Sequence, residues 1–245
     1  MKTPIRLFFT GILCLLFLLT SGCVMNKLSK SPEKITLDKD PEGAQLRIEV
    51  EKGESFTSRM QAGPFIFNVL PQIVMWAEDA NGRFLETLYI TGADFEGFRN
   101  ASKKDKGSLF FKECFPLWAS RLKEAGKTLP SPEQPYPDTV TSVTPSNSFT
   151  LKTAFSIGKK PFTLFLEINK SGDTNSAFTK ENNDWVGQPA LIFKTEITKP
   201  RSGESFHMNL AGHSGKINEK PAIYADISKF DTALRQIKKI TINFK

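Results

Sequence analysis

The chain has 245 residues, of which 39% are hydrophobic and 24% are charged, and its formal net charge is +7. This length is enough for one sizeable core or two small ones. Acidic residues interrupt nearly every basic run, whereas nucleic-acid binders concentrate basic residues on one face. The composition therefore excludes nucleic acid as an expected partner, and it favours a solvated surface with some attraction to anionic headgroups.

The first residues have the parts of a signal peptide. Lys2 and Arg6 form a short basic region, and the apolar run at 7–19 is too short to cross a hydrocarbon core of ~30 Å comfortably as a permanent helix. Small residues at 20–22 then lead into Cys23, a pattern that resembles the lipobox of bacterial lipoproteins. The resemblance implies diacylation of the Cys23 sulfur, cleavage before Cys23 and acylation of the new amino terminus. An uncleaved anchor helix and a plain signal peptide with an incidental cysteine are the alternatives.

The lipobox also implies a location. Several acyl chains such as palmitate, at about 0.8 kcal/mol per buried methylene, hold a protein on a bilayer far more firmly than one chain does. We therefore expect a lipid-anchored protein of the bacterial cell envelope that faces the periplasm. Val24 is not the aspartate that retains lipoproteins on the inner membrane of enteric-type bacteria, which favours the outer membrane if the source has one.

Three segments follow from this pattern. Residues 1–22 are the expected signal peptide, and the polar residues 23–42, which include two prolines, are the expected lipid-anchored flexible tether. The folded domain is expected at 43–245.

Alternating apolar and polar residues predict half-buried strands at 44–50 and 162–169. The Asn-Gly pair at 81–82 predicts a tight hairpin between strands at 73–79 and 83–91, because this pair readily adopts the positive φ that such a turn requires. Further strands are predicted at 149–156, 189–198, 205–210 and 239–244. Short helices are predicted at 226–238 and at 113–126, the second of which ends at Gly126.

Many short strands between turn residues favour an all-β fold, an antiparallel β-sandwich (immunoglobulin-like) with one or two short helices. A Pro-rich stretch at 129–148 divides the strands into two groups. Small sheets rarely stand alone, so we expect a long crossover within a single domain. A linker between two domains is the alternative.

Three groups of residues resemble a known family. They are Pro71-Gln72, Trp76, Glu78-Asp79, Gly82, Thr87-Leu88-Tyr89 and Thr91, followed by Leu117-Trp118 and the stretch 138–145. The pattern is similar to a family of bacterial periplasmic proteins known as domain of unknown function 2271, over about residues 44 to 170. The family name carries no established activity, and the resemblance implies an exported β-sandwich.

The stretch 138–145 also resembles the signature at which exported flavoproteins carry covalent FMN through its phosphate. By position, the attachment residue would be Thr144. Ser142 and Val143 replace the Gly-Ala pair of that signature, and a β-branched valine does not allow the same close backbone approach. We therefore prefer a Ser/Thr turn in which Asp138 caps its own backbone. A flavin-carrying electron-transfer lipoprotein is the alternative.

Oxygen ligands gather at Asn169, Asp173, Asn175 and Asp184. Calcium takes six to eight oxygen ligands, but the spacing is not that of an EF-hand loop. A polar hairpin tip is the preferred interpretation, and a calcium-dependent ligand-binding lipoprotein is the second alternative.

Other candidate residues have structural interpretations. Cys114 lies among aromatic residues and is expected to be a small buried hydrophobe instead of a nucleophile. His207 and His213 are six residues apart and could form a zinc site with Asp226, but no short ligand pair fixes its geometry. The tryptophans are expected to fill the core, unless they gather on the surface as a ring-binding platform.

The chain lacks the nucleophile elbow, the Walker loop and the zincin motif. We therefore expect a lipid-anchored binding or assembly module of the cell envelope without catalysis of its own. Its expected partners are the membrane, through the N-terminal lipid, and an unidentified envelope protein or ligand. No cofactor is expected.

Overall fold

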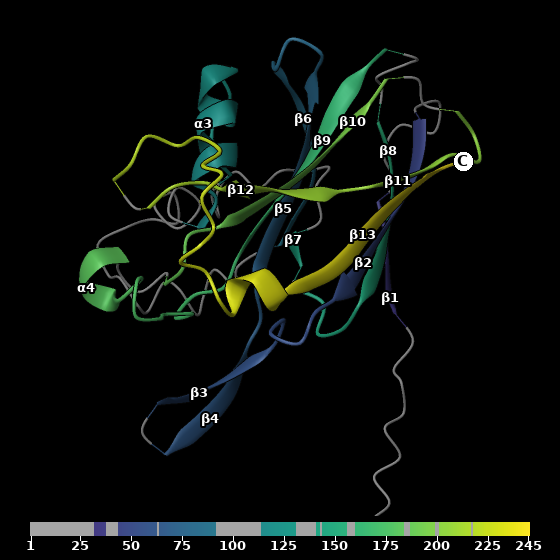
Figure 1. Ribbon diagram of the computed structural model, residues 1–245. Coiled ribbons are helices and arrows are strands. Elements are labelled where there is room, and N and C mark those ends of the chain that lie inside the picture. Colours follow the sequence, from purple (N-terminus) through teal and green to yellow (C-terminus); the bar gives the residue numbers. More distant parts are fainter. Residues whose placement is uncertain are drawn as a thin grey trace, which may run out of the picture. The chain divides into compact units, whose positions relative to one another are not determined.

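Two large β-sheets enclose the main hydrophobic core of a computed structural model (Figure 1). The structure describes residues 32–37, 44–62, 64–91, 114–130, 141–142, 144–155, 160–183, 187–198, 201–216 and 218–245. These belong to a unit that runs from Pro32 to Lys245. The predicted signal peptide and Cys23 lie outside the described residues.

The first sheet has five strands. In spatial order they are β1 (Glu33–Thr36), β8 (Phe149–Phe155), β2 (Ala44–Lys52), β13 (Ile237–Phe244) and β11 (Ser205–His207). All neighbours are antiparallel except β1 and β8, which are parallel.

The second sheet has six strands. In spatial order they are β12 (Asn209–His213), β10 (Leu191–Ile197), β9 (Phe162–Asn169), β5 (Gln72–Asp79), β6 (Phe84–Thr91) and β7 (Thr141–Ser142). Only β6 and β7 are parallel. A separate two-stranded sheet consists of β3 (Ser58–Ala62) and β4 (Phe65–Val69). The described helices are α3 (Pro116–Glu124), α4 (Lys180–Asn183) and the 3-10 helix η2 (Ala233–Arg235).

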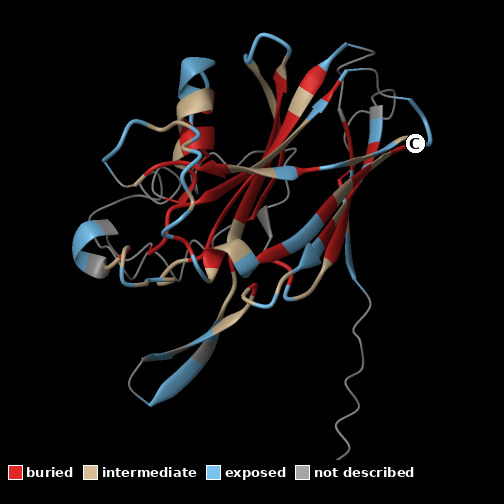
Figure 2. Ribbon diagram, in the orientation of Figure 1, coloured by how far each residue is buried: buried red, intermediate tan, exposed pale blue. Residues whose placement is uncertain are grey.

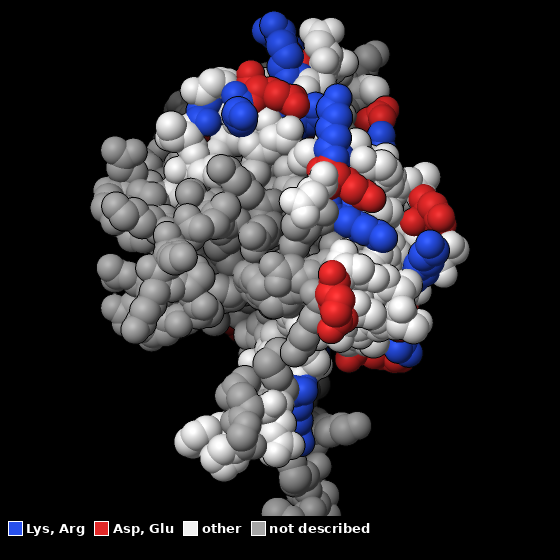
Figure 3. Space-filling view, turned by 90° about the vertical axis from the view of Figure 1, so that its left-hand side faces the viewer, with Lys and Arg blue, Asp and Glu red and all other residues white. Residues whose placement is uncertain are grey.

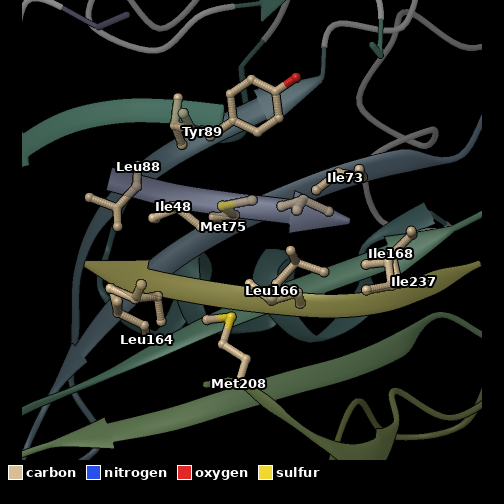
Figure 4. Close-up of a cluster of buried hydrophobic side chains, with 14 of the residues drawn as sticks. Ile48, Ile73, Met75, Leu88, Tyr89, Leu164, Leu166, Ile168, Met208 and Ile237 are labelled. Atoms are coloured by element: carbon tan, nitrogen blue, oxygen red, sulfur yellow. The ribbon is translucent and has the colours of Figure 1, made fainter. Parts of the chain in front are cut away.

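Side chains from both large sheets fill the space between them. Figure 4 shows Ile48 and Ile237 of the first sheet together with Met75, Leu164 and Leu166 of the second. All of these side chains are buried, and the alternation in β2 and β9 predicts this for Ile48, Leu164 and Leu166. The predicted all-β sandwich is therefore confirmed.

The second core lies on the other face of the six-stranded sheet, where α3 packs. It contains Val74 and Trp76 of β5, Phe165 of β9, and Leu117 and Trp118 of α3. The second core covers the other face of β9, so this strand is buried on both faces instead of on the single face that its alternation predicts. The predicted helix at 113–126 is confirmed as α3, and Gly126 follows it with a φ of 70°.

The predicted hairpin at Asn81-Gly82 is confirmed between β5 and β6. Gly82 has a φ of 75°, and Asp79 Oδ1 accepts hydrogen bonds from the backbone N–H groups of Asn81 and Arg83, each at 2.9 Å. The turn is thus stabilised by the same aspartate that ends β5.

Strands from both sides of the Pro-rich stretch 129–148 pair with one another. β2 pairs with β8 in the first sheet, and β5 pairs with β9 in the second. Each large sheet therefore contains residues from both halves of the chain.

The structure contradicts the helix predicted at 226–238. Only Ala233–Arg235 is helical, as η2, and β13 begins at Ile237. The apolar residues of the segment are spaced closely enough to fit a helix, but pairing of β13 with β2 from Ile237 to Phe244 determines the conformation.

Two predicted boundaries also differ. The strand predicted at 205–210 is broken at Met208, so that β11 joins the first sheet and β12 joins the second. The predicted tether 23–42 is too long, because Glu33–Thr36 forms β1 beside β8 and Leu37 is buried. A short polar strand at a sheet edge has no strong apolar period, so its sequence is typical of a linker.

Candidate docking surface

A hairpin formed by β3 and β4 projects away from the two large sheets (Figure 1). Its five-residue strands pair from Ser58 with Val69 to Ala62 with Phe65. It connects the end of β2 to the start of β5, and therefore links the first sheet to the second. The sequence analysis did not predict these strands.

The tip of this hairpin carries large apolar side chains in solvent. Phe65 is 69% exposed and Ile66 is 67% exposed, and Figure 2 shows exposed residues along the hairpin. Neighbouring strand residues point to opposite faces of a sheet. Both faces of the tip are therefore open to solvent, instead of one face packing on the sandwich.

Exposed side chains of this kind have a substantial potential for binding. Transfer of a Phe or Ile side chain from water into an apolar environment contributes about 1.5–3 kcal/mol. Among the residues whose side-chain exposure the structure describes, the other large exposed hydrophobic side chain is Ile223, at 36%. The hairpin tip is therefore the most apolar exposed feature of the described surface, and we call it the docking tip (Phe65 and Ile66).

The base of the hairpin is held firmly. Phe56 is 1% exposed within the main core, and Ser55 N–H donates to the Arg235 carbonyl at 3.0 Å. At Gly53 there is no room for a side chain, because a Cβ would lie 2.0 Å from the same Arg235 oxygen. The docking tip thus projects from a rigid support.

A buried lysine also supports this base. Lys170 is 2% exposed; its Nζ donates to the Ser55 carbonyl at 2.5 Å and lies 3.7 Å from Asp173 Oδ2. Burial lowers the pKa of Lys170, and the carboxylate of Asp173 opposes that effect. Asp173 in turn accepts hydrogen bonds from Thr232 Oγ1 at 2.6 Å and Gln236 Nε2 at 3.1 Å. This network joins the hairpin base to the segment before β13.

The first described residues lie at the same end of the sandwich as this hairpin. Glu33, at the start of β1, pairs with Phe149, and Phe149 pairs on its other side with Val50 near the end of β2. The hairpin begins eight residues after Val50, at Ser58. Strand register therefore places the start of β1 and the end of β2, which leads into the hairpin, at the same end of the first sheet.

The charges near the docking tip are few. Arg59 is the only charged residue in 58–69, where no Asp or Glu occurs. On the face shown in Figure 3, basic side chains (blue) and acidic side chains (red) are interspersed. The hairpin thus combines an apolar tip with one basic side chain.

Thr144, the candidate flavin attachment residue, is buried at 4% exposure. Its hydroxyl donates to the Pro71 carbonyl at 2.5 Å. A transferase would need this oxygen to be accessible, so the folded structure does not favour attachment there. Asp138 and Val143 of the same stretch lie outside the described residues.

Two of the four candidate calcium ligands, Asp173 and Asn175, already have hydrogen-bond partners at their side-chain oxygens. Both carboxylate oxygens of Asp173 accept hydrogen bonds, and Asn175 Oδ1 accepts the N–H groups of Ala177 and Phe178 at 2.9 Å each. Asn169 Nδ2 donates to the Gln188 carbonyl, while its Oδ1 has no hydrogen-bond partner within the described ranges. Asp184 lies outside them.

The two histidines belong to different sheets. His207 is exposed on β11, whereas His213 on β12 stacks against Tyr224 with ring centroids 5.3 Å apart. Burial lowers the pKa of His213. In the part of the chain that the structure describes, no three or more His, Cys, Asp and Glu side chains are grouped to hold a metal ion.

Cys114 and two of the tryptophans are buried, as predicted. Cys114, Trp76 and Trp118 are each 0% exposed within the second core. They therefore offer neither an accessible nucleophile nor a surface platform for a ring. Trp185 lies outside the described residues.

Glu167 is a buried carboxyl group that the sequence analysis missed. It is 0% exposed on β9, and it accepts the N–H groups of Leu117 at 3.2 Å and Trp118 at 2.9 Å. Burial raises its pKa to about 8, although these two hydrogen bonds favour the charged form. Phe115, the N-cap residue of α3, makes no side-chain cap, so Glu167 provides this function from a neighbouring strand.

Glu78 supports the other side of α3. It is 4% exposed, accepts a hydrogen bond from Trp76 Nε1 at 2.9 Å, and lies 3.3 Å from Arg121 Nε. Burial raises the pKa of Glu78, while Trp76 and Arg121 oppose this effect. Perturbed carboxyl groups often mark catalytic sites, but these two hold a helix on a sheet.

Sequence signals for the missed features exist. Gly63-Pro64 separates two runs that fit short strands, and Phe65 to Phe67 form an apolar run directly after this turn. In β9, the apolar Phe165 on the otherwise polar face indicates that this face is covered as well, which would place Glu167 in a buried environment.

No helix among the described residues has both the length and the apolar composition to cross a membrane. Comparison of the chain with protein-family models, with curated proteins and with solved structures found no match.

Proposed function

We propose that this chain is a lipid-anchored binding module of the bacterial cell envelope, without catalysis of its own, which is held through Cys23 and docks through the β3–β4 hairpin. The observation that carries the proposal is the exposure of Phe65 and Ile66 at the end of a rigidly supported hairpin. Apolar side chains exposed in this way are typical of interaction sites.

The arrangement of the buried polar groups supports the same function. Glu167 holds α3, Lys170 holds the base of the hairpin, and Thr144 fixes the segment before β8 to Pro71. Each of these groups has a role in positioning a backbone segment. The lipobox resemblance at Cys23 and the resemblance to the periplasmic family both favour an exported protein, and they remain predictions from sequence.

Docking can be tested by the accessibility of the tip in envelope membranes. Ile66→Cys should react with a membrane-impermeant maleimide several-fold more slowly in washed membranes than after detergent extraction. Cys114 is buried and should contribute little background, which the parent chain measures directly.

Glu196→Cys is the matched control for this experiment. Glu196 is exposed and pairs across Thr163 with Glu78, at the end of the sheet away from the hairpin. It should react equally fast in membranes and in detergent. Equal rates at both positions would show that the tip is not occupied in the envelope, and the proposed docking function would then be wrong.

A further inference from the structure

We propose that the docking tip contacts the interface of the lipid bilayer itself, and that this contact orients the sandwich on the membrane. This inference rests on the proposed lipid anchor and names the partner of the hairpin. It adds a second membrane contact, made by protein side chains, to the predicted one at Cys23.

The direction of the hairpin supports a bilayer as partner. The start of β1 and the base of the hairpin lie at the same end of the sandwich, because Glu33 and Val50 both pair with Phe149. The residues that connect the predicted lipid to the domain therefore reach it at the end from which the hairpin projects. A lipid-held domain would present this end to the membrane.

The connecting segment is long enough for the tip to reach the bilayer. Nine residues separate Cys23 from Glu33, and an extended chain spans at most ~3.3–3.6 Å per residue, or about 30 Å in total. A five-residue strand is about 17 Å long. The tether can therefore span the length of the hairpin while the lipid remains inserted.

The placement of the apolar side chains favours a surrounding medium over a groove. Phe65 and Ile66 lie on opposite faces of the ribbon, and both are exposed. A groove on a partner protein would cover one face, whereas the interfacial layer of a membrane surrounds the tip and covers both.

The backbone limits how deep the tip can insert. The described part of the chain adds no third strand to β3 and β4, so each has an edge without strand pairing. Such an edge is costly in hydrocarbon but is solvated among the headgroups. Arg59 and the lack of acidic residues in 58–69 suit anionic headgroups at the same depth.

The test uses the full acylated chain reconstituted into vesicles of phosphatidylethanolamine and phosphatidylglycerol. Ile66→Cys is labelled with the polarity-sensitive dye NBD, and Glu196→Cys with the same dye is the matched control. The reference is the same labelled chain kept in detergent-free buffer by a soluble carrier. Relative to it, the dye at position 66 should show a several-fold increase in emission and a blue shift in vesicles. The dye at position 196 should show neither change.

Two substitutions and one control examine the chemistry of the contact. Phe65→Ser on the labelled Ile66→Cys background should reduce the emission change, whereas Asn68→Ser, a polar exchange on the same strand, should leave it unchanged. Arg59→Gln should reduce the change in anionic vesicles but not in vesicles of phosphatidylcholine alone. Because these side chains are exposed, folding should be unaffected, which circular dichroism would verify.

Flotation of the vesicles separates failure of this inference from failure of the proposed function. Protein that floats with an unchanged spectrum at position 66 overturns the bilayer contact and leaves the anchor in place. Protein that does not float overturns the anchor and the inference together. A spectral change that depends on protein concentration without vesicles would identify a second copy as the partner and would also overturn the inference.

Discussion

At the scale of single residues, the buried acid Glu167 has the clearest measurable consequence. Its pKa in the folded chain is raised to about 8 from an ordinary value of 4.5. Between these pH values the unfolded chain has lost this proton and the folded chain has kept it. Stability therefore falls as pH rises through this window and levels off above about pH 8.

Glu167→Gln should remove this dependence. We expect the free energy of unfolding of the parent chain to fall, relative to that of the variant, by on the order of a few kcal/mol between pH 4.5 and pH 8. Urea unfolding of both proteins at several pH values measures this difference, and other titrating groups cancel in the comparison. A difference that does not vary with pH would mean that Glu167 is not buried as a neutral acid.

Thr144 provides a second prediction at this scale. Thr144→Val keeps the shape of the side chain but removes the hydrogen bond to the Pro71 carbonyl, so we expect a loss of about 1–3 kcal/mol in unfolding free energy. Thr144→Ser keeps the hydroxyl and should lose less. Chemical denaturation of the three proteins checks this order.

The same hydroxyl distinguishes the flavin alternative. Coexpression with a flavin transferase should add no FMN-phosphoryl mass to the intact chain, because the Thr144 oxygen is buried. An added mass that disappears in Thr144→Ala would make the protein a redox carrier, contrary to the proposed function.

At the scale of elements, β1 divides the predicted tether into two parts. Leu37 follows β1, is 7% exposed, and its N–H donates to the Lys152 carbonyl at 2.9 Å. Leu37→Ala should therefore cost about 2–5 kcal/mol in unfolding free energy. Removal of residues 26–31, outside the described residues, should leave the thermal midpoint nearly unchanged, as expected for a polar segment.

Lys34→Ala is a matched control, because Lys34 is exposed on the same strand. Calorimetry of Leu37→Ala, Lys34→Ala and the 26–31 deletion compares their thermal midpoints with that of the parent chain. If the Leu37 and Lys34 variants unfold at the same temperature, β1 does not contribute to the sheet.

At the scale of the whole molecule, the sequence predicts the features that have a local signal, such as alternating apolar residues, a turn pair or a helix start. The alternation in β2 and β9, the Asn-Gly turn and the Pro-started helix α3 each have a signal within a few residues. Features that depend on distant partners were missed. β1 needs β8 to become a strand, the segment predicted as a helix at 226–238 needs β2 to end as η2 and the start of β13, and the burial of Glu167 needs α3.

The docking tip shows the same limit. A sequence can reveal that Phe65 and Ile66 are apolar, and the ordinary expectation for such residues is burial. Their exposure results from the direction of the hairpin, which is fixed at Gly53, Ser55 and Lys170 by contacts with distant segments. The candidate surface therefore emerges only from the three-dimensional structure.

The central claim is that a lipid at Cys23 holds this module on the membrane, and metabolic labelling with a fatty-acid probe tests it most directly. The parent chain and Cys114→Ala should both incorporate the probe and be cleaved before residue 23. Cys23→Ser should incorporate none and remain an uncleaved precursor, because acylation of the cysteine precedes cleavage in the lipoprotein pathway. Equal labelling of Cys23→Ser and the parent chain would contradict the account.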